Sequence, residues 1–169
     1  AGIFKYYKNK QELFIAVVDK FWFSTQNPRN KFTETNGTFA EFIDEYVRGV
    51  QRTMDMLGDL IGAEREKVAQ GKFTYHAQYF HFLFQLLQYD PDAKEKLRNL
   101  VEVDYAYWRA AIQRAIATGE LREDVDVEDA VVMFRQVYMG LSFEMAFMGG
   151  LNTQRLAKHL HAVYSLLKR

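Results

Sequence analysis

Apolar side chains recur along most of this chain at the 3.6-residue spacing of an amphipathic helix. The first such stripe begins at Leu13 and reaches Phe21, and the spacing returns between polar breaks up to the C-terminus. Runs of β-branched residues are few, and 2 Pro and 10 Gly leave the helical period largely uninterrupted. The pattern predicts an all-α fold. The expected helices span residues 10–25, 38–57, 59–70, 74–88, 91–118, 127–148 and 153–168.

Polar residues and glycines indicate where these helices begin and end. Two residue pairs have the spacing of a capping box: Asn9 with Glu12, and Thr38 with Glu41. In this motif the side chain of each residue accepts a hydrogen bond from the backbone N–H of the other. Three further helix ends are expected: Gly58 as a C-cap, and Asp126 and Asn152 as N-caps. The polar residues 26–37 between the first two helices are interpreted as an internal loop, not a domain boundary.

Residues 74–88 form the most aromatic segment of the chain and are apolar on nearly all sides. We therefore expect a buried helix in the middle of a bundle. His76 and His81 lie five residues apart in it, whereas ligand pairs on a helix favour spacings of three or four. His159 and His161 are only two apart. Core or pocket histidines are the better interpretation, and no metal site is expected.

Composition limits the classes of protein to consider. The length of 169 residues fits one domain with a substantial core, and 22 basic residues balance 22 acidic ones. The body as a whole is therefore not expected to be a nucleic-acid surface. No apolar run reaches the roughly 18 residues of a membrane helix, no signal peptide opens the chain, and there is no Cys. We expect a cytoplasmic protein with no membrane partner.

Catalytic patterns are missing from the sequence. There is no Ser, His and Asp arrangement with nucleophile-elbow glycines and no phosphate-binding glycine loop. Glu64 and Glu66 face different sides of a predicted helix and do not form a natural acid–base pair. The protein is not expected to be an enzyme or to need a cofactor, although helix bundles can assemble sites that leave faint sequence traces.

The first ten residues carry a local positive charge. Lys5, Lys8 and Lys10 occur there without an acidic residue, directly before and at the start of the first predicted helix. A helix N-terminus with added lysines is well suited to bind phosphate. The alternative interpretation of such a segment is a solvated turn.

The order of residues favours the phosphate-binding interpretation. The segment GIFKYYKNKQELF at residues 2–14 resembles the end of the DNA-binding head of TetR-family transcriptional regulators. A second segment, AIATGELREDVD at residues 115–126, precedes a helix that contains Gly140 and Leu141, and it is similar to the junction between the two dimerisation helices of that family. The resemblance implies that two further helices precede Ala1.

The resemblance implies a division of the chain and a set of DNA contacts. Residues 1–9 would be the remnant of a helix-turn-helix head, and residues 10–169 a ligand-binding and dimerisation domain that begins with a connecting helix at 10–25. Lys10 falls where the family places a lysine on a DNA phosphate. Phe4 departs from the usual Tyr and would pack or contact a thymine methyl. The complete set of DNA-binding candidates is Phe4, Lys5, Tyr6, Lys8 and Lys10.

Dimerisation is expected on independent grounds, because the helices at 91–118 and 127–148 are each apolar on more than one face. Two copies of such a pair can cover one another as a four-helix bundle, and the resemblance implies the same homodimer. The candidate interface residues are Tyr107, Ala110, Arg114, Phe134, Val137, Leu141 and Met145.

The excess of aromatic residues predicts a small-molecule pocket, since buried tyrosines need hydrogen-bond partners. The candidate lining residues are Tyr46, Met54, His76, Tyr79, Phe80, Tyr105 and Trp108. With the resemblance, this predicts a repressor that leaves its operator DNA when a small hydrophobic ligand binds, with Phe21, Trp22 and Phe23 sensing the pocket. The competing hypothesis is a helical ligand-binding or scaffolding protein with no role on DNA.

Overall fold

The computed structural model describes residues 6–32, 37–60 and 75–169, with the side chains of residues 57–60, 75, 76 and 78 left out. All regular elements in these ranges are helical, which confirms the predicted all-α class, and one isolated antiparallel bridge joins Leu121 to Lys168. The elements in chain order are α1 (Lys10–Val17), the π-helical turn η2 (Val18–Trp22), α2 (Phe23–Thr25), the 3-10 turn η3 (Pro28–Asn30), α3 (Phe39–Leu60), α5 (Tyr75–Tyr89), α6 (Ala93–Ala117), α7 (Val127–Ala146) and α8 (Thr153–Leu167).

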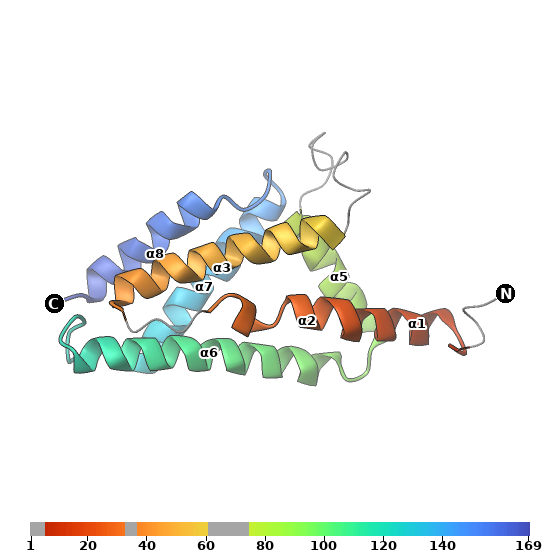
Figure 1. Cartoon of the computed structure of the whole chain (residues 1–169), viewed down its shortest axis with the longest axis horizontal. Coiled ribbons are helices and arrows are strands. Elements are labelled where there is room, and N and C mark those ends of the chain that lie inside the picture. The colour runs from red at the N-terminus through yellow and green to blue at the C-terminus, as the bar shows by residue number, and fades with distance from the viewer. Residues whose placement is uncertain (1–5, 33–36, 61–74) are drawn as a thin grey trace.

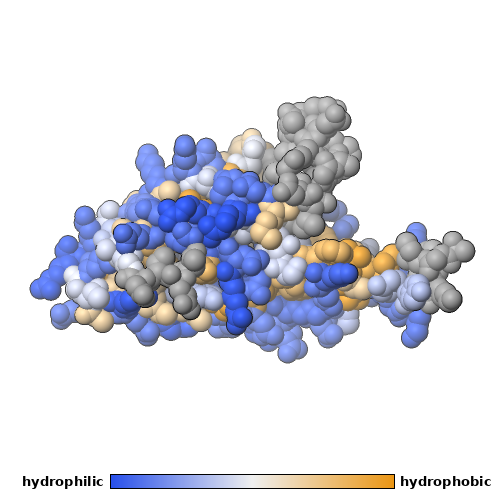
Figure 2. All heavy atoms as spheres, viewed as in Figure 1, coloured by the Kyte–Doolittle hydropathy of each residue, from blue (hydrophilic) through white to orange (hydrophobic). Residues whose placement is uncertain are grey.

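Helices α3, α6, α7 and α8 make up the body of the molecule, and α1 projects from one end of it (Figure 1). The C-terminus lies at the opposite end. Helix α3 packs on α8, α6 packs on α7, and α5 crosses behind the N-terminal segment. An apolar patch marks the surface where α1 leaves the body (Figure 2). No helix among the described residues is long and apolar enough to cross a bilayer.

The N-caps expected from the sequence are present. Thr38 donates its backbone N–H to Glu41 Oε2 at 2.8 Å, and the Glu41 N–H donates to Thr38 Oγ1 at 3.2 Å. The Glu12 N–H donates to Asn9 Oδ1 at 2.8 Å, but Glu12 reaches back to the N–H of Lys8, one residue earlier than a capping box requires. The side chains of Asp126 and Asn152 cap α7 and α8 in the same way.

The connecting helix contains a feature that the sequence pattern does not predict. Residues 10–25 are helical as expected, but they widen to a π turn at residues 18–22. Val18 and Trp22 bracket this turn and are both buried, while Val17 and Phe21 remain largely exposed. The π turn is therefore the point at which the helix enters the body of the molecule.

Several predicted boundaries differ from those in the structure. Gly58 does not end α3, which continues to Leu60, and the helix expected at 59–70 falls almost entirely outside the described residues. Helix α6 begins at Ala93 instead of residue 91, because Asp90 uses its side chain to accept from the N–H of Asp92 and from Lys96. Helix α7 ends at Ala146, shortly before Gly149 and Gly150, which both have positive φ.

The expectation that α5 lies buried in the middle of the bundle is wrong. Phe84 is 64% exposed, Leu87 and Tyr89 are exposed, and only Leu86 is fully buried among the described side chains of this helix. The physical reason is position: α5 lies at the end of the body and packs one side against α1, α6 and α7.

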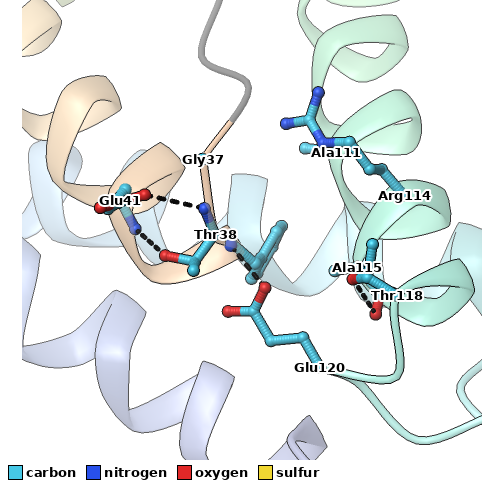
Figure 3. A pocket seen from close by; sticks show the side chains of 9 residues that line it. Gly37, Thr38, Glu41, Ala111, Arg114, Ala115, Thr118 and Glu120 are labelled. Atoms are coloured by element: carbon cyan, nitrogen blue, oxygen red, sulfur yellow. Dashed lines mark hydrogen bonds between the residues drawn. The ribbon is translucent and has the colours of Figure 1, made fainter.

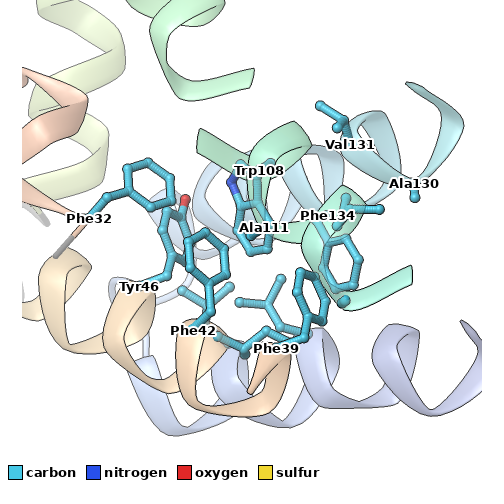
Figure 4. Close-up of a cluster of buried hydrophobic side chains, with 14 of the residues drawn as sticks. Phe32, Phe39, Phe42, Tyr46, Trp108, Ala111, Ala130, Val131 and Phe134 are labelled. Atoms are coloured by element: carbon cyan, nitrogen blue, oxygen red, sulfur yellow. The ribbon is translucent and has the colours of Figure 1, made fainter. Parts of the chain in front are cut away.

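The main core is built around the Trp108 indole (Figure 4). Phe134 stacks on this ring with centroids 4.9 Å apart, and Phe42 and Tyr46 meet it edge-on at 5.1 and 4.9 Å. Phe134 is 0% exposed, so its assignment to a dimer interface is wrong. It occupies the inward face of α7 and packs within its own protomer.

A close backbone approach fixes the loop after η3 on α3. A Cβ on Gly49 would lie 2.1 Å from the carbonyl oxygen of Lys31 and 2.5 Å from its Cα, so the position requires glycine. The contact places Lys31 and Phe32 in the interior. Phe32 then stacks on Tyr107 at 4.6 Å and on Phe42 at 5.6 Å.

A second, smaller core joins the connecting helix to α5 and the start of α6. Val18, Trp22, Leu86 and Ala93 are its fully buried members. Phe14, Phe23, Tyr79, Phe82, Leu83, Leu97 and Leu100 pack around them.

Candidate functional site

Charged and aromatic polar side chains from four helices and the loop after η3 interact electrostatically in the interior. Some of them belong to the main core, and Tyr79 packs against the second core. Tyr46 comes from α3, Tyr79 from α5, Asp104 and Trp108 from α6, and Arg135 and Tyr138 from α7. We call the seven residues Lys31, Tyr46, Tyr79, Asp104, Trp108, Arg135 and Tyr138 the polar cluster.

The ion pair between Asp104 and Arg135 forms the centre of the polar cluster. Arg135 Nη1 donates to Asp104 Oδ2 at 2.6 Å, with the two side chains 13% and 4% exposed. Asp104 lies one helical turn before Trp108 on α6, so both face the interior. A charge pair with so little contact with water depends on its geometry, because each ion has lost most of its hydration.

Burial perturbs the ionisation of this cluster. Desolvation raises the pKa of Asp104, although Arg135 and Lys31 oppose the shift. Desolvation also raises the pKa of Tyr46, and the nearby Asp104 charge adds to the effect. The pKa of Tyr79 is raised as well, first by burial and then by Tyr138. Both hydroxyls therefore remain protonated at neutral pH and can donate hydrogen bonds.

Four buried polar atoms among the described residues lack a hydrogen-bond partner. They are Tyr46 Oη, Asp104 Oδ1, Trp108 Nε1 and Ser142 Oγ, and three of them belong to the polar cluster. Figure 4 shows the Tyr46 hydroxyl and the Trp108 indole nitrogen on the same side of the aromatic core. Leaving such an atom unsatisfied costs about 1–3 kcal/mol, so three of them in one cluster make it a candidate site for a polar ligand.

Two protein cations already occupy aromatic faces at this site. Lys31 Nζ lies 4.9 Å from the ring centroid of Tyr138, and the Arg135 guanidinium lies 5.9 Å from that of Tyr105. Lys31 is buried, held there by the contact of its backbone with Gly49. The cluster therefore combines two cations with one carboxylate.

Sequence reasoning found the aromatic part of this site and missed its charges. Of the seven ligand candidates, Tyr46, Tyr79 and Trp108 belong to the polar cluster, and Tyr105 lies under Arg135. Met54 packs against the main core. Phe80 lies at the edge, between Tyr79 and Phe143. The side chain of His76 lies outside the described residues.

Lys31, Asp104 and Arg135 were not among the candidates. The available signal was their occurrence among apolar residues: Asp104 falls within the apolar stripe of α6, and Arg135 directly follows the buried Phe134. A charged side chain on the inward face of a helix is rarely buried without a partner of opposite charge. Two such residues of opposite sign can therefore be predicted from the sequence to form an ion pair.

The polar cluster is one aromatic contact away from the connecting helix. The Tyr79 ring stacks on Trp22 with centroids 5.8 Å apart, and Trp22 in turn packs on Phe82 at 5.6 Å. Phe14 on α1 contacts Phe82 at 5.5 Å. Of the three aromatic residues expected to sense the pocket, Trp22 makes this contact, whereas Phe21 is 46% exposed.

Polar contacts also connect α1 and η2 with the body. Lys96 Nζ donates to Asp19 Oδ1 at 2.7 Å and to Asp90 Oδ2 at 2.9 Å, which joins η2 to the start of α6. Gln11 Nε2 donates to the carbonyl oxygen of Tyr89 at the end of α5. The connecting helix is therefore bonded to α5 at Gln11 and to α6 at Asp19.

Comparison with known proteins matches residues 50–160 to the tetracyclin repressor-like C-terminal domain. The chain belongs to the TetR family. It is therefore a member of a family of ligand-responsive transcriptional regulators with an all-helical regulatory domain. The matched range contains Tyr79, Asp104, Trp108 and Arg135. Neither the curated proteins nor the solved structures that were compared match this chain.

The residues that the TetR resemblance assigns to DNA lie at or before the start of α1. Phe4 and Lys5 fall outside the described residues. Tyr6 is 79% exposed, and Lys8 and Lys10 are exposed at the N-terminal turn of the helix, which the Asn9 side chain caps. Their side chains are thus accessible at the projecting end of the molecule (Figure 1).

The candidate dimer residues of this TetR-family chain do not share one face. Val137 and Leu141 line a groove of about 410 Å³ between α7 and α8, and Met145 accepts a long hydrogen bond from Arg155 across it. Tyr107 is partly buried against Phe32. Ala110 and Arg114 are exposed on α6, away from this groove.

A second surface pocket, of about 310 Å³, contains Arg114 and lies at the start of α3 (Figure 3). The carboxylate of Glu120 already accepts hydrogen bonds from the first backbone N–H groups of α3, that of Phe39 at 2.7 Å and that of Ala40 at 3.3 Å. Tyr164 donates to the same carboxylate at 2.9 Å. Because these polar groups are partnered, this pocket is a weaker candidate for a ligand site than the polar cluster. Within the described ranges, no cluster of His, Asp or Glu is arranged to hold a metal ion.

Proposed function

We propose that this protein is a transcriptional repressor that is released from its operator when a small molecule binds at the polar cluster. The observation that carries the proposal is the concentration of unpartnered, buried polar atoms one aromatic contact from the connecting helix. A ligand that contacts Tyr46 and Trp108 would fill a site with an apolar wall and a few polar groups, as ligand sites usually have.

The route from ligand to DNA follows the packing. A ligand that displaces the Tyr79 ring also moves Trp22, because the two rings are stacked. Trp22 closes the π turn, beyond which α1 leads to Lys10. A small rotation at the turn is amplified at the projecting end. Ligand and DNA then favour different conformers, with a typical coupling of about 1–3 kcal/mol, or roughly 5- to 150-fold in affinity.

A homodimer is part of this proposal. We place its contact on α7 and α8, and not on α6 and α7 as the sequence pattern predicts, because the apolar groove lies between α7 and α8. The groove between these helices is bordered by the 68% exposed Leu166 and by Val137 and Leu141, and Val132 and Met133 add exposed apolar area on α7. A second copy placed on this face would cover it and leave both α1 helices free. Two heads must then stand roughly 34 Å apart to enter successive major grooves, a spacing that tilting of α1 would disturb.

Duplex binding by the full-length polypeptide, measured by fluorescence anisotropy over a range of salt concentrations, tests the DNA assignment. Affinity should fall steeply with salt, because phosphate contacts release counterions. Lys10→Ala should weaken binding to all sequences about equally and lower the salt slope by about one. The control is Lys168→Ala, an exposed lysine at the opposite end of the molecule, which should change neither.

The competing hypothesis of a helical binding protein without a role on DNA predicts a different result. A full-length protein that is monomeric and does not bind duplex at low ionic strength would support it and exclude the repressor. Loss of binding to a single sequence on replacing Lys10 would contradict the phosphate role of this residue.

A further inference from the structure

The polar cluster carries more positive than negative charge. Lys31 and Arg135 are cationic, and among the described residues the carboxylate that acts on both is that of Asp104. All three side chains are buried or nearly so. An unbalanced charge in the interior is costly unless a partner of opposite sign compensates it.

The features that would attract a cationic ligand are already occupied. Tyr138 presents its ring to Lys31 and Tyr105 presents its ring to Arg135, so these two aromatic faces hold the protein's own cations. One oxygen of Asp104 is bound to Arg135. A cationic molecule would have to enter beside two fixed like charges, which disfavours it.

Two of the three unpartnered atoms of the cluster, Tyr46 Oη and Trp108 Nε1, suit a ligand that accepts hydrogen bonds. Trp108 Nε1 can only donate, and the Tyr46 hydroxyl remains protonated at neutral pH because burial raises its pKa. Asp104 Oδ1 differs from these two atoms, because it belongs to the carboxylate that is bound to Arg135 and can only accept. Tyr46 and Trp108 have ring centroids only 4.9 Å apart, so their donors can reach the same group.

We infer that the polar cluster binds a small organic acid, with the carboxylate of the ligand facing Lys31, Tyr46 and Trp108 and its apolar body against the neighbouring aromatic rings. The inference rests on the proposed ligand site and specifies its chemistry. Lys31 is the specificity-determining residue, because among the described residues no carboxylate forms an ion pair with it, whereas Asp104 is bound to Arg135. Gly49 serves as a positioning residue by allowing the backbone of Lys31 to approach α3.

Calorimetric titration of the protein at neutral pH with matched probes tests this chemistry. Octanoate, octanamide and octylamine share one apolar body and differ in charge, and phenylacetate with phenylacetamide repeats the comparison on an aromatic body. We expect each acid to bind about tenfold or more tightly than its amide, because hydrogen bonds between charged partners are roughly twice as strong as neutral ones. The amine should bind most weakly.

Variants at Lys31 separate its charge from its packing. Lys31→Met keeps most of the apolar stem and should bring the acid-to-amide affinity ratio close to one, while amide affinity changes little. Lys31→Arg keeps the charge and should retain the preference for the acid. Lys168→Met, at an exposed lysine remote from the cluster, is the matched control and should behave as the wild type. Circular dichroism verifies the fold of each variant.

Each other outcome has a defined meaning. Equal affinity for acid and amide, tightest binding of the amine, or no binding of either acid at millimolar concentration overturns the inference. An unchanged acid preference in Lys31→Met overturns the role of this residue. If the amide or the amine releases the full-length protein from DNA as well as the acid does, the proposed function stands and the inference fails. If the acid binds selectively but leaves the affinity for DNA unchanged, the inference stands and the proposed function fails.

Discussion

Replacing Arg135 by Met tests whether the interior of this protein depends on its buried ion pair. The substitution approximately conserves volume but leaves the Asp104 carboxylate, which is 4% exposed, without its cation at 2.6 Å. Removing one partner of a buried pair costs about 3–5 kcal/mol, against at most about 1 kcal/mol for an exposed pair. For a chain of this size each kcal/mol lowers Tm by roughly 2–4 °C, so Tm should fall by roughly 6–20 °C.

The pH dependence of this loss identifies its cause. Burial already raises the pKa of Asp104, and removing Arg135 removes a charge that lowers it. The folded variant therefore binds a proton more readily than the unfolded chain does. Its stability deficit should be largest above the raised folded-state pKa and should shrink as the pH falls through that value toward the ordinary carboxyl range.

Urea denaturation followed by circular dichroism, at one fixed protein concentration and several pH values, provides the free energies of unfolding. The double variant Asp104→Asn with Arg135→Met, which removes both charges, should recover much of the loss at neutral pH. A deficit below about 1 kcal/mol, or one that is the same at every pH, would refute the reasoning.

Three further predictions concern two glycines, a core phenylalanine and an exposed leucine. Gly49→Ala should destabilise the fold by about 1–3 kcal/mol in urea denaturation, because its Cβ would overlap the backbone of Lys31. Gly140→Ala, whose Cβ meets nothing within 4 Å, should instead stabilise α7 by about 0.5–1 kcal/mol; equal effects would contradict the close approach. Phe134→Ala should cost about 3–5 kcal/mol as a core residue. Leu166→Lys should leave the protomer folded but weaken self-association in analytical ultracentrifugation, and an unchanged dimer would exclude the groove between α7 and α8 as the contact.

The sequence predicts most helix ends because the signals that set them are local. A capping box such as that of Thr38 and Glu41 needs only four consecutive residues and forms wherever the helix starts. The π turn at residues 18–22 has no comparable signal, since Val18 and Trp22 would also share a face in an ordinary α-helix. It depends on how the connecting helix packs against α5.

The errors at α5 and Phe134 share a cause. An apolar pattern shows which side chains avoid water, but it does not show whether the cover comes from the same chain. For α5 the pattern suggested a central position, and the helix lies at the end of the body. For α7 a wide apolar surface suggested a dimer contact at Phe134, which packs on Trp108 within its own protomer.

In the candidate site, too, the features that depend on neighbouring residues in the sequence were predicted, and those that depend on contacts between distant residues were not. Aromatic richness indicated Tyr46, Tyr79 and Trp108, whereas the pairing of Asp104 with Arg135 joins residues 31 positions apart on two helices. The role of Gly49 is equally non-local, because a glycine within a helix is ordinarily only a weak point until the backbone of Lys31 is placed against it.

The most direct test of ligand control is the dissociation constant of the full-length protein for duplex DNA, measured with and without the small molecule that stabilises it most in a thermal-shift screen. Occupancy of the polar cluster should raise this constant by roughly 5- to 150-fold. Replacing Tyr79 by Ala, which removes the ring stacked on Trp22, should reduce that effect when each measurement is made at saturating ligand. An unchanged dissociation constant at saturating ligand would contradict the account.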